Sequence, residues 1–285
     1  MPSVKKLLNT AEDRTFRELL KATSMAVCPK VRVADVLPIE GSGVDSASFK
    51  YALQAHFDFV VTDATHTPVF AVEFDGPGHR DDEDQIARDL KKNSLCARFA
   101  FPLLRINDNH VSRLYNQRTL LVWIVEVYEL QQAFAQAQDR GAIPLDEPFD
   151  PMLFITAGNS SETFPYWIGR RARLRLLELG RSGAIPHAVT SGILWFDDDG
   201  TIRGLEFVEV SDSLAIVHRT AMRPQLFPIN FSDLLSELLV IFLVERLETW
   251  LLTKVGAEPL VRVQEEFDRR FKSRYGRAHF AGPRG

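Results

Sequence analysis

The chain is organised around the stretch Ala71-Val-Glu-Phe-Asp-Gly-Pro-Gly-His79. An apolar run carries Glu73 and Asp75 two residues apart and then ends in a Gly-Pro-Gly turn before His79. Side chains alternate between the two faces of a strand, so both carboxylates are predicted to share one face at a strand end. Adjacent carboxylates repel each other and are costly to desolvate. Three arrangements would relieve this: a cation between them, a proton on one of them, or a face open to water.

The composition is that of a globular protein. The 285 residues are 45% hydrophobic and 25% charged, which predicts a packed core and leaves room for two domains. The net charge of -4 means that any nucleic-acid contact would need a local basic face. Two distant cysteines, Cys28 and Cys96, indicate a reducing compartment rather than a disulfide scaffold. With no apolar signal segment and no apolar run long enough to span a bilayer, a cytoplasmic protein without membrane contact is expected.

The first half of the chain alternates helical and strand patterns. Strands are predicted at 27–36, 56–62, 69–75 and 102–106, helices at 9–24, 80–99 and 111–138, and a loop at 38–50. Thr10 is the predicted cap of the first helix, with Asp13 as its capping-box partner. Glu12 is read as a residue that favours the positive helix end, with proximity to an active site as the less favoured alternative.

Asp58 is unusual because aspartate is depleted in strands, yet here it lies between Phe57 and Phe59. About six residues separate its strand from the next one, a spacing that favours an antiparallel hairpin. Such a hairpin would place Asp58 beside Glu73 and Asp75. The order of elements predicts an α/β architecture with a mixed four-stranded sheet flanked by helices.

Residues 139–151 contain three prolines and predict a boundary, with domains at 1–140 and 141–285. The second half predicts an α+β domain with a basic helix at 166–179, a hairpin at 192–210, a strand at 214–218 and a long helix at 231–255. Arg170, Arg171 and Arg173 either contact phosphates or cover a solvated helix face, and both interpretations stay open. The acidic turn Asp197–Asp199 is better explained as a solvated hairpin turn than as a cation site.

Four segments together resemble the motifs of the PD-(D/E)XK nucleases: His56-Phe-Asp-Phe-Val60, Val72-Glu-Phe-Asp-Gly-Pro-Gly-His79, Arg88-Asp-Leu-Lys-Lys92 and Pro102-Leu-Leu-Arg-Ile106. The branch they resemble most contains the very-short-patch repair endonucleases, together with an uncharacterised bacterial domain family that shares the ExDGxxH signature. The resemblance covers about residues 5 to 130. It implies a restriction-endonuclease-like core and metal-dependent cleavage of phosphodiester bonds.

The resemblance also implies roles for single residues. Asp58 matches the first carboxylate of the family, and Glu73 matches the acidic residue of the (D/E)XK element. Asp75 stands where the standard pattern has lysine, although the repair-endonuclease-like branch accommodates aspartate there, followed by glycine and histidine. Lys92, on the following helix, is the candidate for the displaced positive charge.

Phosphodiester hydrolysis needs a nucleophilic water, neutralisation of developing charge and help for the leaving oxygen. A Mg²⁺ or Mn²⁺ ion held by Asp58, Glu73 and Asp75 can supply all three. His79 is predicted to act as a general acid or base, and capping of the turn is an equal alternative. Arg105 is predicted to pair with a site carboxylate rather than with phosphate.

These residues predict a Mg²⁺-dependent endonuclease that acts on DNA. The alternative is a nuclease-like module without turnover that binds nucleic acid or a protein, because the usual lysine is missing after Glu73. A functionless, wet carboxylate face is the least favoured reading, since Asp58 lies in an aromatic strand. The C-terminal domain is expected to bind substrate or regulate, and it is the candidate surface for a homodimer or a protein partner.

Overall fold

The computed structural model describes residues 4–76, 83–154, 164–272 and 277–279. The chain forms two compact units. The first unit comprises Met1–Pro151 and Gln225–Ile229, and the second comprises Met152–Pro224 and Asn230–Gly285. The division therefore falls at the end of the proline-containing segment rather than at residue 140. The return of Gln225–Ile229 to the first unit differs from the simple two-domain expectation.

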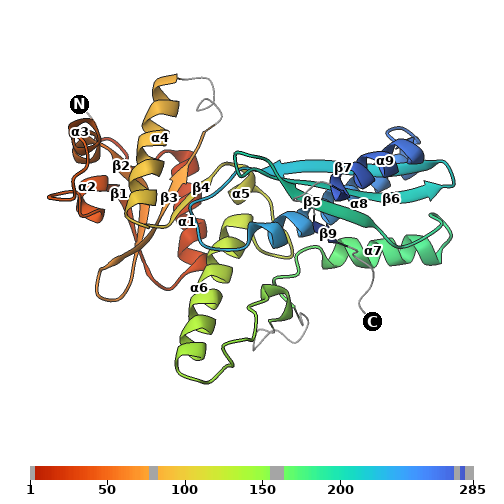
Figure 1. Ribbon diagram of the computed structural model, residues 1–285, viewed down its shortest axis with the longest axis horizontal. Coiled ribbons are helices and arrows are strands. Elements are labelled where there is room, and N and C mark those ends of the chain that lie inside the picture. Colours follow the sequence, from red (N-terminus) through yellow and green to blue (C-terminus); the bar gives the residue numbers. More distant parts are fainter. Residues whose placement is uncertain (1–3, 77–82, 155–163, 273–276, 280–285) are drawn as a thin grey trace. The chain divides into compact units, whose positions relative to one another are not determined.

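The first unit is built on a four-stranded sheet with the order β1-β2-β3-β4 (Figure 1). The strands are β1 (Ala26–Arg32), β2 (His56–Thr62), β3 (Pro68–Phe74) and β4 (Leu103–Ile106). β1, β2 and β3 pair antiparallel, whereas β3 and β4 pair parallel. The predicted mixed four-stranded sheet and its hairpin are therefore confirmed. Most residues of β2 and β3 are buried, as expected for central strands covered on both faces.

Helices flank this sheet. They are α1 (Thr10–Ala22), α2 (Val33–Val36), α3 (Ser46–Gln54), α4 (Glu83–Arg98), α5 (Asn109–Ser112) and α6 (Leu120–Asp139). α1 packs against α6, and the ring of Phe16 in α1 stacks on Phe59 of β2. Lys92, Leu95 and Cys96 are the buried residues of α4. The buried side of α4 thus includes a lysine, whereas its apolar Ile86 and Leu90 are exposed.

Four local predictions are corrected. The helix predicted at 111–138 is two helices, α5 and α6, with no helix at residues 113–119. The strand predicted to reach residue 36 ends at Arg32, because Val33–Val36 forms the short helix α2. The loop predicted at 38–50 contains the start of α3, where the Asp45 carboxylate accepts hydrogen bonds from the first backbone N–H groups. The cap of α1 is Asn9, which forms a capping box with Glu12, rather than Thr10 with Asp13. The cap lies one residue earlier than predicted, so the helix is the same and the capping hydrogen bonds come from other side chains.

A segment from far along the chain completes the first sheet. The backbone N–H of Leu103 in β4 donates to the carbonyl of Leu226 at 2.9 Å. The ring of Phe227 packs against Phe70 and Tyr128, with centroid separations of 5.3 and 4.9 Å. Gln225–Ile229 therefore covers backbone groups of β4 that would otherwise face solvent at the sheet edge.

The second unit has an antiparallel sheet with the order β8-β7-β6-β5-β9. Its strands are β5 (Ser191–Phe196), β6 (Ile202–Ser211), β7 (Leu214–Met222), β8 (Glu258–Pro259) and β9 (Arg277–His279). Its helices are α7 (Arg170–Arg181), α8 (Phe231–Thr253) and α9 (Leu260–Phe271), and a 3-10 turn spans Pro151–Leu153. The hairpin, the added strand and the long helix of the predicted α+β unit are all present.

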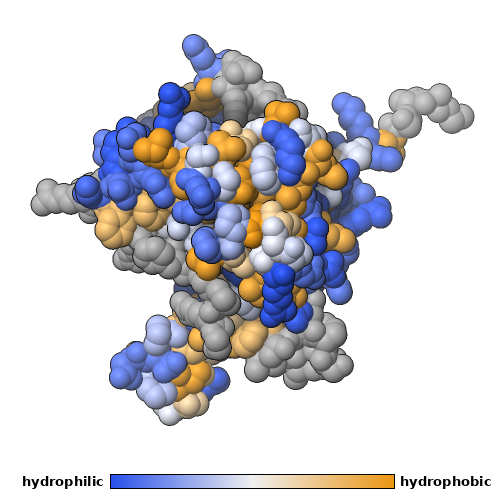
Figure 2. Space-filling model, turned by 90° about the vertical axis from the view of Figure 1, so that its right-hand side faces the viewer, coloured by the Kyte–Doolittle hydropathy of each residue, from blue (hydrophilic) through white to orange (hydrophobic). Residues whose placement is uncertain are grey.

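Helix α8 packs on β6 and β7, and this explains its almost continuous apolar sequence. None of the helices within the described ranges is both long and apolar enough to cross a membrane. In the view of Figure 2, hydrophobic residues are interspersed with hydrophilic ones over the surface. Single exposed apolar side chains of this kind are normal on a protein surface.

Candidate active site

Charged side chains form a row across the first sheet. Glu73 of β3 pairs in register with Arg105 of β4. The β2–β3 register, Phe59 with Val72, places Asp58 opposite Glu73 when it is continued by one residue. Lys30 of β1 lies between two residues paired with β2, and its ammonium contacts Asp58. Lys30, Asp58, Glu73 and Arg105, one residue per strand, are called the charged row below.

Asp58 and Glu73 are held together through the backbone. The N–H of Asp58 donates to Glu73 Oε1 at 3.2 Å, and the N–H of Phe74 donates to Asp58 Oδ2 at 2.9 Å. One oxygen of each carboxylate is therefore held by a backbone N–H of the neighbouring strand. The predicted proximity of Asp58 and Glu73 is confirmed.

Lys92 of α4 compensates the charge of Glu73. Its Nζ lies 2.7 Å from Glu73 Oε2, donates to the carbonyl of His56 at 2.8 Å and stands 5.5 Å from the Phe57 ring centroid. Both side chains of this ion pair are only 8% exposed. The cation proposed from sequence thus lies in the site, enclosed by its partners.

Burial raises the pKa of Glu73 to about 7, and the nearby Asp58 adds to this shift, while Lys92 and Arg105 oppose it. A buried carboxylate with this pKa changes its charge near neutral pH. Two of the three ways to relieve carboxylate repulsion, a cation and a proton, are therefore both present at Glu73.

Asp75, directly after β3, is bound by Arg105. Arg105 Nη1 lies 2.8 Å from Asp75 Oδ1, and Nη2 lies 3.1 Å from Asp89 Oδ1. Arg105 Nε donates to Asn93 Oδ1 at 2.9 Å. The predicted pairing of Arg105 with a site carboxylate is confirmed.

The backbone of Arg105 is held from the distant segment Gln225–Ile229. The Arg105 N–H donates to Gln225 Oε1 at 3.0 Å, and Gln225 Nε2 donates to the Arg105 carbonyl at 3.1 Å. The amide of Gln225 thus takes the place of a neighbouring strand at this point. Nothing in the local sequence around Gln225 indicates this contact.

Glu12 and Lys30 join the site from α1 and β1. Lys30 Nζ lies 2.7 Å from both Glu12 Oε1 and Asp58 Oδ1. Glu12 also accepts the N–H of Asn9 through Oε2, so it caps α1 and contacts the charged row at the same time. Burial alone would lower the pKa of Lys30, but its hydrogen bonds to Asp58 and Glu12 outweigh burial and raise it. Sequence reasoning missed Lys30, whose signal was a basic residue opposite Asp58 in the predicted sheet.

Residues 4–123 match the model of a family described as "Protein of unknown function (DUF2726)". No curated protein matches the chain, and no solved structure does. The matched segment contains Glu12 and the whole charged row, and it ends before Gln225. The site therefore lies within the part of the chain that resembles other proteins.

The other predicted site residues lie elsewhere. His79 falls outside the described residues. Arg170, Arg171 and Arg173 lie on α7 of the second unit. Arg173 Nη2 donates to the buried Glu237 Oε1 at 2.6 Å, and its guanidinium lies 5.0 Å from the Trp167 ring. Arg173 therefore has a structural ion pair that the sequence did not indicate, whereas phosphate contact by the exposed Arg170 and Arg171 stays a prediction.

The carboxylates of the charged row and Asp75 differ in how well they could hold a divalent cation. Within the described residues, no group of three or more His, Cys, Asp or Glu is arranged to hold a metal ion. Mg²⁺ usually takes one or two carboxylates from a protein and completes its shell with water. Asp58 and Glu73 meet this lesser requirement as neighbouring hard oxygen donors. Asp75, bound to Arg105, is the least available of the three predicted ligands.

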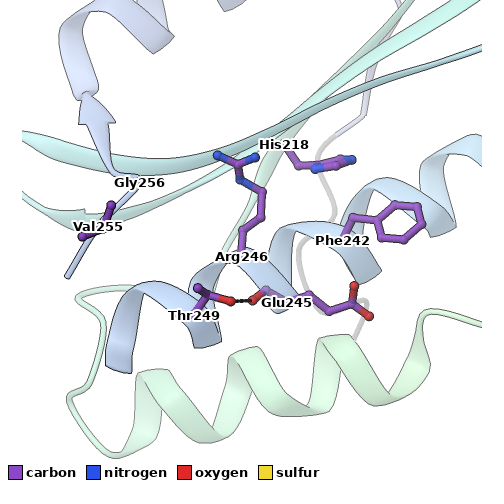
Figure 3. A pocket seen from close by; sticks show the side chains of 7 residues that line it. All are labelled: His218, Phe242, Glu245, Arg246, Thr249, Val255 and Gly256. Atoms are coloured by element: carbon purple, nitrogen blue, oxygen red, sulfur yellow. Dashed lines mark hydrogen bonds between the residues drawn. The ribbon is translucent and has the colours of Figure 1, made fainter. Parts of the chain in front are cut away.

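A pocket of about 390 Å³ lies in the second unit between β7, α8 and the turn after α8 (Figure 3). It is lined by His218, Phe242, Glu245, Arg246, Thr249, Val255 and Gly256. The His218 ring packs 5.2 Å from Phe242, and burial lowers the pKa of this histidine. The Thr249 hydroxyl already donates to the Glu245 carbonyl (Figure 3). With one carboxylate and a neighbouring arginine, this pocket is a poorer divalent-metal site than the charged row.

Proposed function

We propose that the first unit is a Mg²⁺- or Mn²⁺-dependent nuclease that hydrolyses phosphodiester bonds, with DNA as its substrate. The observation that carries this proposal is the position of Asp58 and Glu73 on adjacent strands, where the Asp58 N–H donates to Glu73 and the Phe74 N–H donates to Asp58. A restriction-endonuclease-like core, inferred from the resemblance of the motifs, agrees with the mixed sheet.

Asp58 and Glu73 would hold the cation, which supplies a nucleophilic water and stabilises negative charge when it is bound. The N–H groups of Asp58 and Phe74 keep the two carboxylates in place. Lys92 keeps Glu73 near its strand and supports its ionised form. Arg105 pairs with Asp75, so this carboxylate is less available to the cation, and the ion pair holds the chain where β3 ends.

The charge balance of the site depends on a bound cation. Three basic side chains, Lys30, Lys92 and Arg105, contact five carboxylates, which are those of Glu12, Asp58, Glu73, Asp75 and Asp89. With all five ionised, two negative charges remain, and a bound divalent cation would offset them and so allow a phosphodiester to approach. Because the overall charge is -4, any attraction for an anionic substrate must come from the site itself.

The test is cleavage of supercoiled and linear DNA by the full chain with Mg²⁺ or Mn²⁺. Wild type is expected to cut, and Asp58→Asn and Glu73→Gln are expected to lose at least about 100-fold in rate because each removes a hard ligand. Glu40→Gln, an exposed acid of the same unit, is the matched control. Cleavage that survives in both site variants would overturn the assignment.

A second candidate function is a nuclease-like module that binds DNA without turnover. It is favoured by the observation that Asp58, Glu73 and Asp75 each already have a basic partner in the absence of metal. Retention of DNA in a gel-shift assay, with no product across Mg²⁺ and Mn²⁺ on several DNA forms, would select this function over the first.

A further inference from the structure

The outer side of β4, the last strand of the first sheet, is paired with a distant segment of the chain. The N–H of Leu103 on this side donates to the Leu226 carbonyl at 2.9 Å. Two residues later, the N–H of Arg105 donates to Gln225 Oε1 at 3.0 Å, and the Arg105 carbonyl accepts from Gln225 Nε2 at 3.1 Å. A side-chain amide therefore continues the pairing that the backbone of Leu226 begins.

Glutamine has the chemistry that this contact needs. Its side chain carries a donor and an acceptor in one plane, as a peptide group does, whereas an ionised carboxylate only accepts. Arg105 is 7% exposed, so its backbone groups would lose a partner that water does not readily replace. The amide of Gln225 therefore holds the position of Arg105 along the edge of the sheet.

The guanidinium of Arg105 connects this edge to two other elements. Its Nη1 lies 2.8 Å from Asp75 Oδ1, directly after β3. Its Nη2 lies 3.1 Å from Asp89 Oδ1, and its Nε donates to Asn93 Oδ1 at 2.9 Å, both on α4. The side chain is only 8% exposed. A shift of the Arg105 backbone would therefore disturb the end of β3 and the placement of α4.

Both of these elements bear on Glu73. The helix α4 carries Lys92, whose Nζ lies 2.7 Å from Glu73 Oε2, in the position before Asn93. Arg105 also pairs in register with Glu73 and, as a nearby cation, favours its ionised form. The placement of Arg105 thus affects Glu73 directly and also through α4.

We infer that Gln225 is a positioning residue of the candidate active site: its amide sets the backbone of Arg105, and Arg105 sets Asp75 and α4 around Glu73. Gln225 lies between β7 and α8 in the chain, outside residues 4–123 that match the family. The site thus depends on a residue that the family-matched segment lacks. The catalytic part of this inference rests on the proposed function, whereas the placement of Arg105 does not.

Site-resolved amide hydrogen exchange of the full chain tests the placement of Arg105. Gln225→Met keeps most of the side-chain length and removes both amide groups. The variant is expected to exchange the Arg105 N–H about tenfold faster than wild type, because a hydrogen bond is lost. The N–H of Leu103 should exchange at the wild-type rate, because its acceptor is the backbone carbonyl of Leu226. This second amide is the internal control for attachment of the whole segment.

The same measurement follows the effect to the end of β3. The N–H of Asp75 donates to the Ile106 carbonyl at 2.7 Å, next to Arg105. In Gln225→Met its exchange is expected to rise as well, by a smaller factor than that of Arg105, because the hydrogen bond is weakened rather than removed.

Steady-state cleavage of DNA with Mg²⁺ tests the catalytic part. Gln225→Met is expected to lower kcat about tenfold or more and to leave KM within about twofold, because the reacting groups are misplaced. Gln225→Glu keeps the acceptor for the Arg105 N–H and loses the donor, so its kcat should lie between the two. Leu226→Ala changes an exposed neighbour, keeps its backbone bond and should cut like wild type. Urea denaturation verifies that each variant is fully folded in the assay.

A double variant separates positioning from a general structural role. If Gln225 acts through the guanidinium of Arg105, Gln225→Met should have little further effect on kcat in an Arg105→Lys background. Two independent structural losses would instead multiply. A full additional loss in the double variant therefore overturns the inference.

The outcomes also separate the inference from the proposed function. Unchanged exchange at Arg105 in Gln225→Met overturns the inference, and so does an equal rise at Leu103, because the whole segment has then detached. Wild-type kcat in Gln225→Met overturns the inference and leaves the nuclease proposal standing. Absence of cleavage by wild type overturns the proposed function, and faster exchange at Arg105 and Asp75 with unchanged Leu103 then still supports placement by Gln225.

Discussion

Glu73 and Lys92 form a buried ion pair inside the first unit. Lys92→Met is expected to lower the free energy of unfolding by roughly 3–5 kcal/mol at pH 8, because a buried carboxylate loses its partner. At pH 5.5 the loss should be smaller, since Glu73, whose pKa is already raised to about 7, can take up a proton. Urea denaturation at both pH values measures this difference.

The control for this pair is the double variant Lys92→Met with Glu73→Gln, which has no buried charge to compensate. It should recover much of the stability at pH 8 and show little dependence on pH. A Lys92→Met variant that loses the same free energy at pH 5.5 and pH 8 would contradict an ionised Glu73 as the cause.

Glu206 of β6 is a second buried acid, 4% exposed, and burial raises its pKa from 4.5 to about 7. Between these values the folded chain keeps the proton and the unfolded chain releases it, so the free energy of unfolding falls as pH rises. Glu206→Gln removes this penalty. Between pH 5 and pH 8, its free energy of unfolding is expected to rise relative to that of wild type by roughly 1–3 kcal/mol. Urea denaturation across this range measures the gain.

Glu265→Gln on α9, an exposed acid, serves as the matched control for Glu206. Its stability should follow that of wild type at every pH. Because Glu73 titrates in wild type and in both variants alike, its contribution cancels in the comparison. Parallel pH profiles for Glu206→Gln and wild type would rule out the raised pKa of Glu206.

At the scale of elements, the edge of β4 depends on Gln225–Ile229. Phe227 is 4% exposed and packs on Phe70 and Tyr128. Phe227→Ala is therefore expected to lower the free energy of unfolding, measured by urea denaturation, by roughly 3–5 kcal/mol. Leu226→Ala is the adjacent control, because Leu226 is 40% exposed and pairs through its backbone. It should cost under about 1 kcal/mol by the same measurement. Equal losses in both variants would show that Phe227 does not anchor the segment.

At the scale of the whole molecule, the first unit is not continuous in sequence. A fragment of residues 1–151 lacks the partner of β4 and the ring that covers Phe70, so it is expected to unfold at a lower urea concentration than the first unit of the full chain. A fragment in which a flexible linker joins residues 225–229 to residues 1–151 should recover much of the lost resistance to urea. A fragment of 1–151 as stable as the intact chain would show that the returning segment contributes little.

Local rules explain how much of the fold could be predicted. Apolar runs and a short connection predicted β2, β3 and their hairpin, and the facing of Asp58 and Glu73 follows from them. Errors occurred where short polar side chains reorganised the backbone, as at Asn9 and Asp45, because several nearby residues could serve as the cap.

By itself, the sequence of this protein determined the four strands of the first sheet, its central hairpin and the two carboxylates that face each other. The tertiary structure alone decided which cations meet them: Lys30 with Asp58, Lys92 with Glu73 and Arg105 with Asp75. It also brought Glu12 and Gln225 to the site from segments far apart in the sequence. Alternation and turn length act over a few residues, whereas these contacts depend on strand register and on helix packing between distant segments.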